Sequence, residues 1–210
     1  VMGTALGDAP VCSIAVGDSV LPTDPTNLTL DECDRLVPAA LDGKAVHVGH
    51  YLEPRLVYTT EGYLTAPTAV EGRRTMHIGI DLFAPDGRPV YAPLEGEVVT
   101  AIDRANPQDY GGTVVLRHTT DDGDAFFTLY GHLDPASIAG LKTGDRLRSG
   151  ALFATLGSSA VNGGWQPHLH FQLAMCLPDG ETASVDDWPG VADADDLAYF
   201  SALYPNPADL

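Results

Sequence analysis

Short runs of β-branched and aromatic residues, separated by Gly, Pro and Asp, fill the chain from about residue 76 to 175 and constrain its fold most. No apolar repeat at helical spacing links these runs, and their composition is typical of strands joined by tight turns. The sequence therefore predicts an all-β fold, an antiparallel β sandwich or barrel with short flanking helices. The expected strands are 90–101 (two short strands hinged by Pro93 and Gly96), 113–117, 126–130, 146–147, 152–156 and 168–174.

Two segments flank this block and divide the chain into three parts. Residues 1–60 form an N-terminal prologue, in which Thr29-Leu30-Asp31-Glu32 has a capping-box pattern and predicts a short helix to about Leu41. Residues 61–178 contain the expected strands. Residues 179–210 form an acidic C-terminal tail, where Leu197, Phe200 and Leu203 follow a run of aspartates and predict another short helix.

The charge of the chain argues against a nucleic-acid partner. Its 29 acidic and 11 basic residues give a formal charge of −18, whereas phosphate binding needs a basic face. No window of about 18 uncharged apolar residues occurs, so we expect no membrane span. No basic segment followed by an apolar run opens the chain, so no secretory signal is visible. This favours a cytoplasmic location and leaves a secreted or periplasmic one open.

Two histidines share one face of the last expected strand. Because side chains alternate along a strand, His168 and His170 lie on the same side, about 6.6 Å apart along the chain. Gln172 continues that polar face, while Leu169 and Phe171 point the other way. A plain core strand would not place two imidazoles on one face. One of them can bind a metal while the other stands beside a bound water.

A second pair, His77 and Asp81, is informative only if the chain bends between its members. A straight strand would separate residues four apart by about 13 Å, which is too far for one ion, and Ile78-Gly79-Ile80 is poor helix sequence. We therefore expect a bend at Gly79, where backbone freedom is available.

Of the other histidines, His132 is the best placed to reach a cleft. It follows Tyr130-Gly131 at an expected strand end, where glycine permits a sharp turn, although an ordinary surface histidine is the simpler interpretation. His118 either supports the site from behind or is a satisfied strand histidine. His47 and His50 lie outside the strand block, and we expect them to be structural.

Together these residues predict a metal-dependent hydrolytic site. Two histidines and a carboxylate suit a tetrahedral zinc that keeps its fourth position open for water, and two further histidines remain to transfer protons. The sequence contains no H-E-x-x-H helix, no G-x-S-x-G elbow and no C-x-x-C pair among its three cysteines. These absences argue against the other common hydrolase sites.

Three motifs, in order, resemble the lysostaphin-like zinc endopeptidases, metallopeptidase family twenty-three. They are Met76-His77-Ile78-Gly79-Ile80-Asp81, Tyr130-Gly131-His132-Leu133 and Pro167-His168-Leu169-His170-Phe171. The match covers residues 76–175, about half of the chain. The resemblance implies a β sandwich of the barrel-sandwich hybrid type with a narrow groove. It also implies His77, Asp81 and His170 as ligands of one zinc ion, with His132 and His168 as catalytic residues.

What this family does implies a function. Its members mostly cut peptide cross-links in bacterial cell walls, often next to glycine, so the resemblance implies a zinc metalloendopeptidase acting on peptide or peptidoglycan. Zinc would activate a water, one histidine would take its proton, and the pair would stabilise the tetrahedral oxyanion. Which histidine is the base stays open.

The sequence also departs from the family pattern. Many members carry a tyrosine shortly before the first zinc histidine, but residues 70–75 contain none, and Tyr63 is the nearest upstream candidate. The loop 158–166, which includes Trp165, is not the usual Ser/Thr/Gly-rich approach to the third motif. This loop bears on substrate choice.

A second resemblance concerns the context of the chain. The segments 51–58, 106–111 and 160–165 look like those of peptidase-like modules in long bacterial polypeptides. Such modules lie between a small-molecule-kinase-like domain and a class III aminotransferase-like domain, which implies fusion-partner domains. The alternative function is then a non-catalytic metal- or peptide-binding module within a larger multidomain enzyme. An all-β domain with coincidental histidines would have to produce three ordered motifs by chance.

Overall fold

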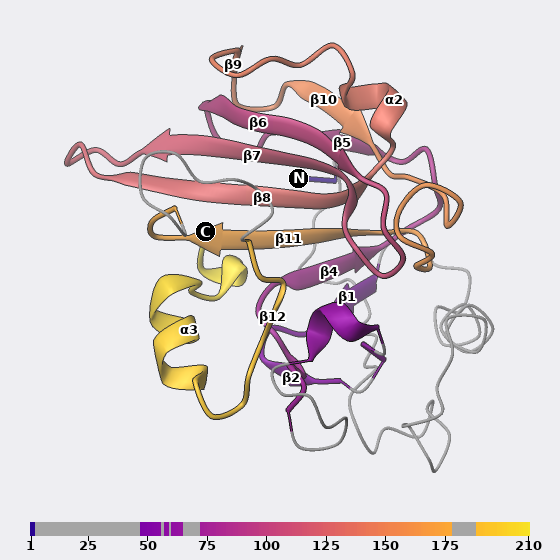
Figure 1. Cartoon of the computed structure of the whole chain (residues 1–210). Helices are drawn as coiled ribbons and strands as arrows, with labels where there is room; N and C mark the ends of the chain where they lie inside the picture. The colour runs from indigo at the N-terminus through magenta and orange to yellow at the C-terminus, as the bar shows by residue number, and fades with distance from the viewer. Residues whose placement is uncertain (3–46, 56, 59, 65–71, 178–187) are drawn as a thin grey trace.

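Most of the molecule is built on one large antiparallel sheet (Figure 1). The computed structural model describes residues 1–2, 47–55, 57–58, 60–64, 72–177 and 188–210. The sheet has seven strands, all antiparallel to their neighbours. In spatial order they are β1 (His47–Gly49), β4 (Ile80–Phe83), β11 (His168–Ala174), β8 (Ala125–Leu133), β7 (Gly111–Thr119), β6 (Gly96–Arg104) and β9 (Arg146–Leu147).

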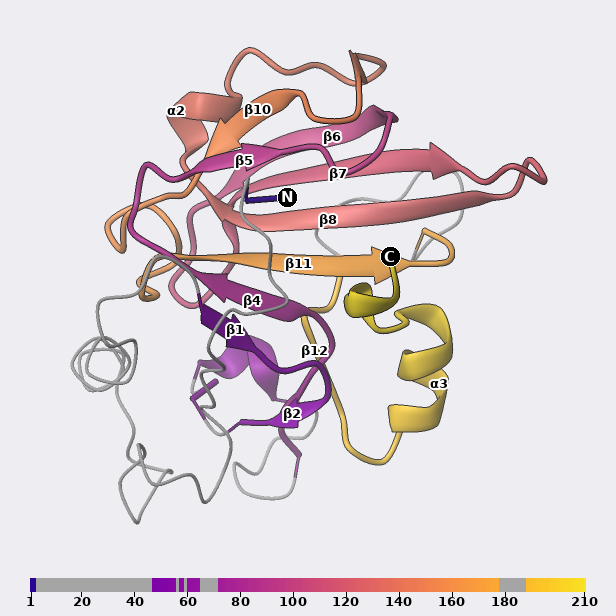
Figure 2. The same ribbon diagram turned by 180° about the vertical axis from the view of Figure 1, so that it is seen from behind.

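Two smaller sheets lie against this large one (Figures 1 and 2). One consists of β5 (Pro89–Tyr91) and β10 (Leu152–Thr155). The other has the order β12 (Val191–Ala192), β3 (Met76–His77) and β2 (Glu53–Pro54). The described helices are short: η2 (Glu61–Tyr63), α2 (Pro135–Ile138), α3 (Leu197–Leu203) and η5 (Pro207–Asp209). None of them is long and apolar enough to cross a bilayer.

Alternation along the central strands gives the sheet two buried faces. On β7, Val114 and Leu116 pack into the core beneath β5 and β10, whereas Val115 between them packs into a second core on the opposite face. That second core includes Trp188 and Tyr204, and the apolar side of α3 borders it. A strand buried on both faces has a continuous apolar run in its sequence, which is the pattern of 114–116.

The predicted fold class is confirmed: the described chain is mostly strand, its sheets are antiparallel, its helices are short, and its large sheet does not close into a barrel. The expected strands at 146–147 and 168–174 have the predicted bounds, and the C-terminal helix is α3. The other expected strands are present with bounds that differ from the predicted ones. For example, β6 continues to Arg104, and β10 ends at Thr155. The helix expected from Thr29 to about Leu41 lies outside the described residues.

Leu169 is the core residue between the two histidines of β11, so it tests whether the histidine face depends on the packing behind it. It is fully buried in the first core, and we expect Leu169→Ala to lower the free energy of unfolding by about 2–5 kcal/mol. Urea denaturation measures this loss. Leu152→Ala, at a leucine that is 58% exposed, is the matched control and should change stability little. Equal losses in the two variants would contradict this packing.

Candidate metal and catalytic site

A break between β3 and β4 brings His77 and Asp81 together. β3 belongs to the three-stranded sheet and β4 to the seven-stranded sheet, so the chain changes sheets between them. The two side chains then meet, with His77 Nε2 at 3.2 Å from Asp81 Oδ1. The expected bend is therefore present at the expected place.

Gly79 is required in this bend for a different reason from the one expected. It does not adopt a left-handed backbone, so extra conformational freedom is not what the site uses. A Cβ at this position would lie 2.5 Å from His170 Cε1 and 2.9 Å from the carbonyl oxygen of Phe171. Glycine is needed because the His170 imidazole occupies the space of a side chain.

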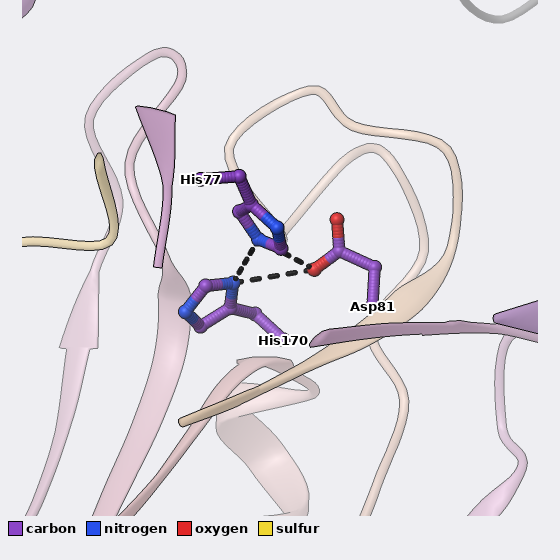
Figure 3. Close-up of side chains that lie close together, drawn as sticks. All are labelled: His77, Asp81 and His170. Atoms are coloured by element: carbon purple, nitrogen blue, oxygen red, sulfur yellow. Dashed lines mark hydrogen bonds and ion pairs between the residues drawn. The ribbon is translucent and has the colours of Figure 1, made fainter. Parts of the chain in front are cut away.

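Strand pairing adds His170 to the pair. His170 lies opposite Asp81 in the β11–β4 register, and its Nδ1 is 3.2 Å from Asp81 Oδ1. The same Nδ1 is 3.0 Å from His77 Nε2. Figure 3 shows the resulting triangle of two ring nitrogens and one carboxylate oxygen. All three residues are buried.

The outer hydrogen bonds of the two imidazoles fix which nitrogens carry protons. His77 Nδ1 lies 2.9 Å from the carbonyl oxygen of His50 and must donate to it. Gln172 donates its amide to the carbonyl of Pro189, which turns its Oε1 toward His170 Nε2 at 3.0 Å. His170 therefore donates through Nε2. In the neutral tautomers, lone pairs of His77 Nε2 and His170 Nδ1 face each other.

This arrangement fits a metal ion. Two lone pairs and an ionised carboxylate at 3.0–3.2 Å repel one another unless a cation or a proton lies between them. Tetrahedral zinc, with bonds to nitrogen and oxygen of roughly 2.0–2.2 Å, places its ligand atoms roughly 3.3 Å apart. The observed spacing is close to that value.

The surroundings hold these ligands in the ionisation states that a metal needs. Burial, with a further contribution from the Arg55 charge, lowers the pKa of His77 to about 4. Burial opposes ionisation of Asp81, but the positive charge of His77 when it is protonated, and that of Arg55 at every pH, outweigh burial and hold the pKa of that carboxyl well below its usual range. His77 is therefore a neutral imidazole and Asp81 an ionised carboxylate at neutral pH.

His132 reaches the site from a β-bulge next to the end of β8, which agrees with the expected strand end. Gly112 pairs with Leu133 and Val114 with Tyr130, so β8 carries one more residue than β7 between these pairs. His132 itself, with φ of 61°, takes the left-handed backbone that we had expected glycine to permit. Its Nδ1 donates to the carbonyl of Asn162 at 2.9 Å, which leaves Nε2 with the lone pair.

His168 lies beside His132, with ring centroids 4.2 Å apart. Its Nδ1 donates to the carbonyl of Gln166 at 2.6 Å, and its Nε2 is 3.7 Å from Asp81 Oδ1. Burial lowers the pKa of His168, and burial together with the neighbouring imidazoles lowers that of His132 well below its usual value. Both rings thus present an unprotonated Nε2 at neutral pH, next to the ligand triangle.

All five predicted site residues line one cavity of about 1050 Å³. Aromatic side chains form part of its wall: the Tyr58 ring lies 4.8 Å from the Tyr63 ring and 5.8 Å from the Trp165 ring. The Tyr63 hydroxyl donates to the carbonyl of Gln108. Tyr110 lines the same cavity, and its buried hydroxyl has no hydrogen-bond partner among the described residues. The hydroxyl of Tyr63, the nearest upstream candidate, is instead bound to the backbone.

The remaining histidines resolve the alternatives left open by the sequence. His118 is a satisfied strand histidine, because its ring nitrogens bond to the carbonyl of Glu95 at 2.8 Å and to Thr128 Oγ1 at 2.7 Å. His50 is exposed and contributes only its backbone carbonyl, which orients His77. Of His47 only the backbone is described, in β1.

The sequence analysis did not predict the residues that hold the five site side chains in place. Arg55 is bonded to Asp81, and Asn162 and Gln166 contribute backbone carbonyls. No spacing rule of the sequence includes these positions, since they lie in loops or, for Arg55, directly after a two-residue strand. Gln172 had a usable signal, its place on the polar face of β11 with His170.

Sequence comparison identifies the family. The profile described as Peptidase family M23 matches residues 75–183, which are 109 of the 210 residues. The chain belongs to peptidase family M23. The M23 match covers all five residues of the site, and it confirms the lysostaphin-like resemblance of the three motifs.

Several named proteins are similar to this M23 chain. DD-carboxypeptidase/endopeptidase Mpg of Neisseria meningitidis serogroup B is 36% identical over 161 residues, which are 69% of this chain and 34% of that protein. Peptidoglycan DD-endopeptidase ShyC of Vibrio cholerae is 31% identical over 107 residues, 50% of this chain and 22% of that protein. The catalytic domain of lysostaphin from Staphylococcus simulans has 25% sequence identity and a TM-score of 0.41, over 66% of this chain and 88% of that one. The chain thus spans about a third or less of the length of these curated relatives.

Gly79 offers a test of the site geometry that changes no charge. We expect Gly79→Ala to displace the His170 ring and to lower the free energy of unfolding by about 1–3 kcal/mol, because the added methyl group has no room. Chemical denaturation measures this loss. Gly140→Ala is the control, since a Cβ there meets nothing within 4 Å and the backbone is not left-handed. A stable Gly79→Ala protein with an unshifted His170 ring would contradict the account.

Proposed function

We propose that this M23 member is a zinc-dependent endopeptidase that hydrolyses peptide bonds, with peptidoglycan-type or Gly-rich peptides as substrates. One observation carries the proposal. Two imidazole lone pairs and a carboxylate oxygen converge at 3.0–3.2 Å, and two more histidines with free Nε2 lone pairs lie next to them. Metal binding alone would need only the two imidazoles and the carboxylate.

One zinc ion would be held by His77 Nε2, Asp81 Oδ1 and His170 Nδ1. Three protein ligands leave the fourth tetrahedral position for water or substrate, which is the composition of catalytic zinc sites and not of structural ones. When bound, zinc lowers the pKa of water from about 16 toward about 7 and polarises a carbonyl group.

His132 and His168 handle the proton and the developing charge. Each ring is fixed by a backbone carbonyl at Nδ1, so each presents Nε2 toward the reacting groups. One Nε2 accepts the proton of the attacking water, and the imidazolium formed in this way donates a hydrogen bond to the oxygen that becomes negative and then gives the proton to the leaving amine as the C–N bond breaks. Because the two rings are 4.2 Å apart, both can act on the same small group of atoms.

The cavity wall supports a peptide substrate. It combines aromatic rings with charged groups that are mostly paired with each other, such as Arg104 with Asp109 at 2.9 Å. Flat aromatic surfaces suit the small side chains and exposed backbone of Gly-rich or D-amino-acid peptides. The N. meningitidis and V. cholerae relatives are named as DD-peptidases, and these names support the same class of substrate.

Zinc should stabilise the folded protein through the three ligands. With zinc at about 100 times its dissociation constant, we expect a gain of about 2.7 kcal/mol in unfolding free energy, reversed by a chelator. Thermal unfolding with and without zinc measures this gain. His77→Ala should lose it, whereas His118→Asn, at a buried histidine that faces no metal, should keep it. Equal gains in both variants would place the ion elsewhere.

The hydrolase itself is tested by mass spectrometry of zinc-loaded protein with Gly-rich peptides, D-amino-acid-containing peptides and purified cell wall. We expect cleavage that disappears on chelation. His132→Ala should retain zinc and lose about 10²–10⁴-fold in rate, the usual contribution of a general acid–base group. Full activity in that variant would overturn the assigned role. Tight peptide binding without cleavage, with zinc confirmed bound, would favour the non-catalytic binding module instead.

A further inference from the structure

Arg55 is buried directly behind the ligand triangle. It follows β2, and its side chain is only 3% exposed. Its Nη1 donates to Asp81 Oδ2 at 2.6 Å, and its Nε donates to Glu53 Oε2 at 2.6 Å. Tyr58 accepts a longer bond from the same Nη1, at 3.3 Å. An arginine in this place needs an explanation, since a buried charge is costly unless it is paired.

The two carboxylate oxygens of Asp81 have different partners. Oδ2 is bound by Arg55, whereas Oδ1 faces His77 Nε2 and His170 Nδ1, each at 3.2 Å. A carboxylate without such a partner could turn and offer both oxygens to an ion. The bond to Arg55 therefore decides which oxygen lies in the triangle.

We propose that Arg55 is a positioning residue for the metal, holding Asp81 Oδ2 so that Oδ1 alone completes the ligand set with His77 and His170. This inference rests on the proposed metal at the site. It concerns the outer contacts of the ligands, whose loss typically costs 10–100-fold in metal affinity.

Arg55 is fixed to the same strand that carries His77. Glu53, its other partner, lies opposite His77 in the β2–β3 register, and the Arg55 backbone N–H bonds to the carbonyl of Thr75 at 2.8 Å. There is little free space around the pair: a Cβ on Gly49 would lie 3.1 Å from Arg55 Nη2 and 3.2 Å from Asp81 Cβ. The position of Asp81 is therefore set relative to His77.

Arg55 contributes by fixing the position of the Asp81 carboxylate and not by attracting the metal ion. A guanidinium repels a divalent cation, and the carboxylate of Glu53 offsets that charge. The planar fork lets one side chain bind Glu53 through Nε and Asp81 through Nη1 at the same time. Lysine keeps the charge but has a single ammonium on a flexible stem, so it cannot reproduce this double contact.

The test measures zinc affinity by competition with a chelator, on variants shown to be folded by circular dichroism. We expect Arg55→Lys to bind zinc about 10–100-fold more weakly than the parent. The double variant Glu53→Gln/Arg55→Met removes one charge of each sign and should show the same loss. Arg104→Lys, at another arginine that is ion-paired in the cavity wall, is the matched control and should bind zinc as the parent does.

A spectroscopic readout separates positioning from general loosening. With cobalt(II) in place of zinc, a four-coordinate site absorbs visible light more strongly than a five-coordinate one. If Asp81 turns to offer both oxygens, the bands of the Arg55 variants should weaken, while those of Arg104→Lys should not.

The outcomes are distinguishable. A parent that binds no zinc would overturn the proposed function. A parent that binds zinc, with folded Arg55 variants that match its affinity and cobalt spectrum, would overturn only the role of Arg55. If both Arg55 variants fail to fold while Arg104→Lys folds, the arginine is structural and the positioning role is wrong.

Discussion

The break between β3 and β4 is the constraint on which the rest of the site depends. A straight strand keeps residues four apart at about 13 Å, but the transfer of the chain from one sheet to the other brings His77 within 3.2 Å of Asp81. The pairing of β4 with β11 then places His170 opposite Asp81 without any further device. Gly79 matters at this break because the His170 imidazole fills the space where its side chain would be.

This geometry is unfavourable for the protein without a cation. Two neutral imidazoles direct lone pairs at each other, and a carboxylate oxygen lies beside both, in a buried place where such repulsion is strong. Hydrogen bonds to His50 and Gln172 keep the rings from rotating to relieve it. Functional sites commonly retain arrangements of this kind at some cost in stability. A chain selected only for a stable β fold would have apolar residues here.

The sequence predicted the five site residues because each lies in a motif of fixed spacing. It also predicted the central strands, since their apolar runs are bounded by turn residues. It assigned backbone freedom to Gly79 and Gly131, but neither is left-handed, and a Cβ on either would collide with a neighbouring ring, that of His170 or Tyr110. A glycine in a motif indicates either backbone freedom or lack of space, and only the folded neighbours decide between the two. It missed Arg55, because this residue lies just after a two-residue strand and is 26 residues from Asp81 in the sequence. No periodicity marks such a contact.

The tautomers of His77, His132 and His168 are set by backbone carbonyls and not by the side chains of the motifs that contain these histidines. Carbonyl oxygens of His50, Asn162 and Gln166 each accept the Nδ1 proton of one imidazole, which directs Nε2 inward. Any residue type supplies a carbonyl, but the buried side chain of Asn162 also bonds to the backbone of Gly157 and Trp165 and so holds the loop that positions this carbonyl. The Trp165 ring and the Asn162 carbonyl belong to the same loop, so the segment that forms part of the cavity wall also orients His132. A change in this loop would therefore alter the cavity wall and the orientation of His132 together, which couples the two in the molecule.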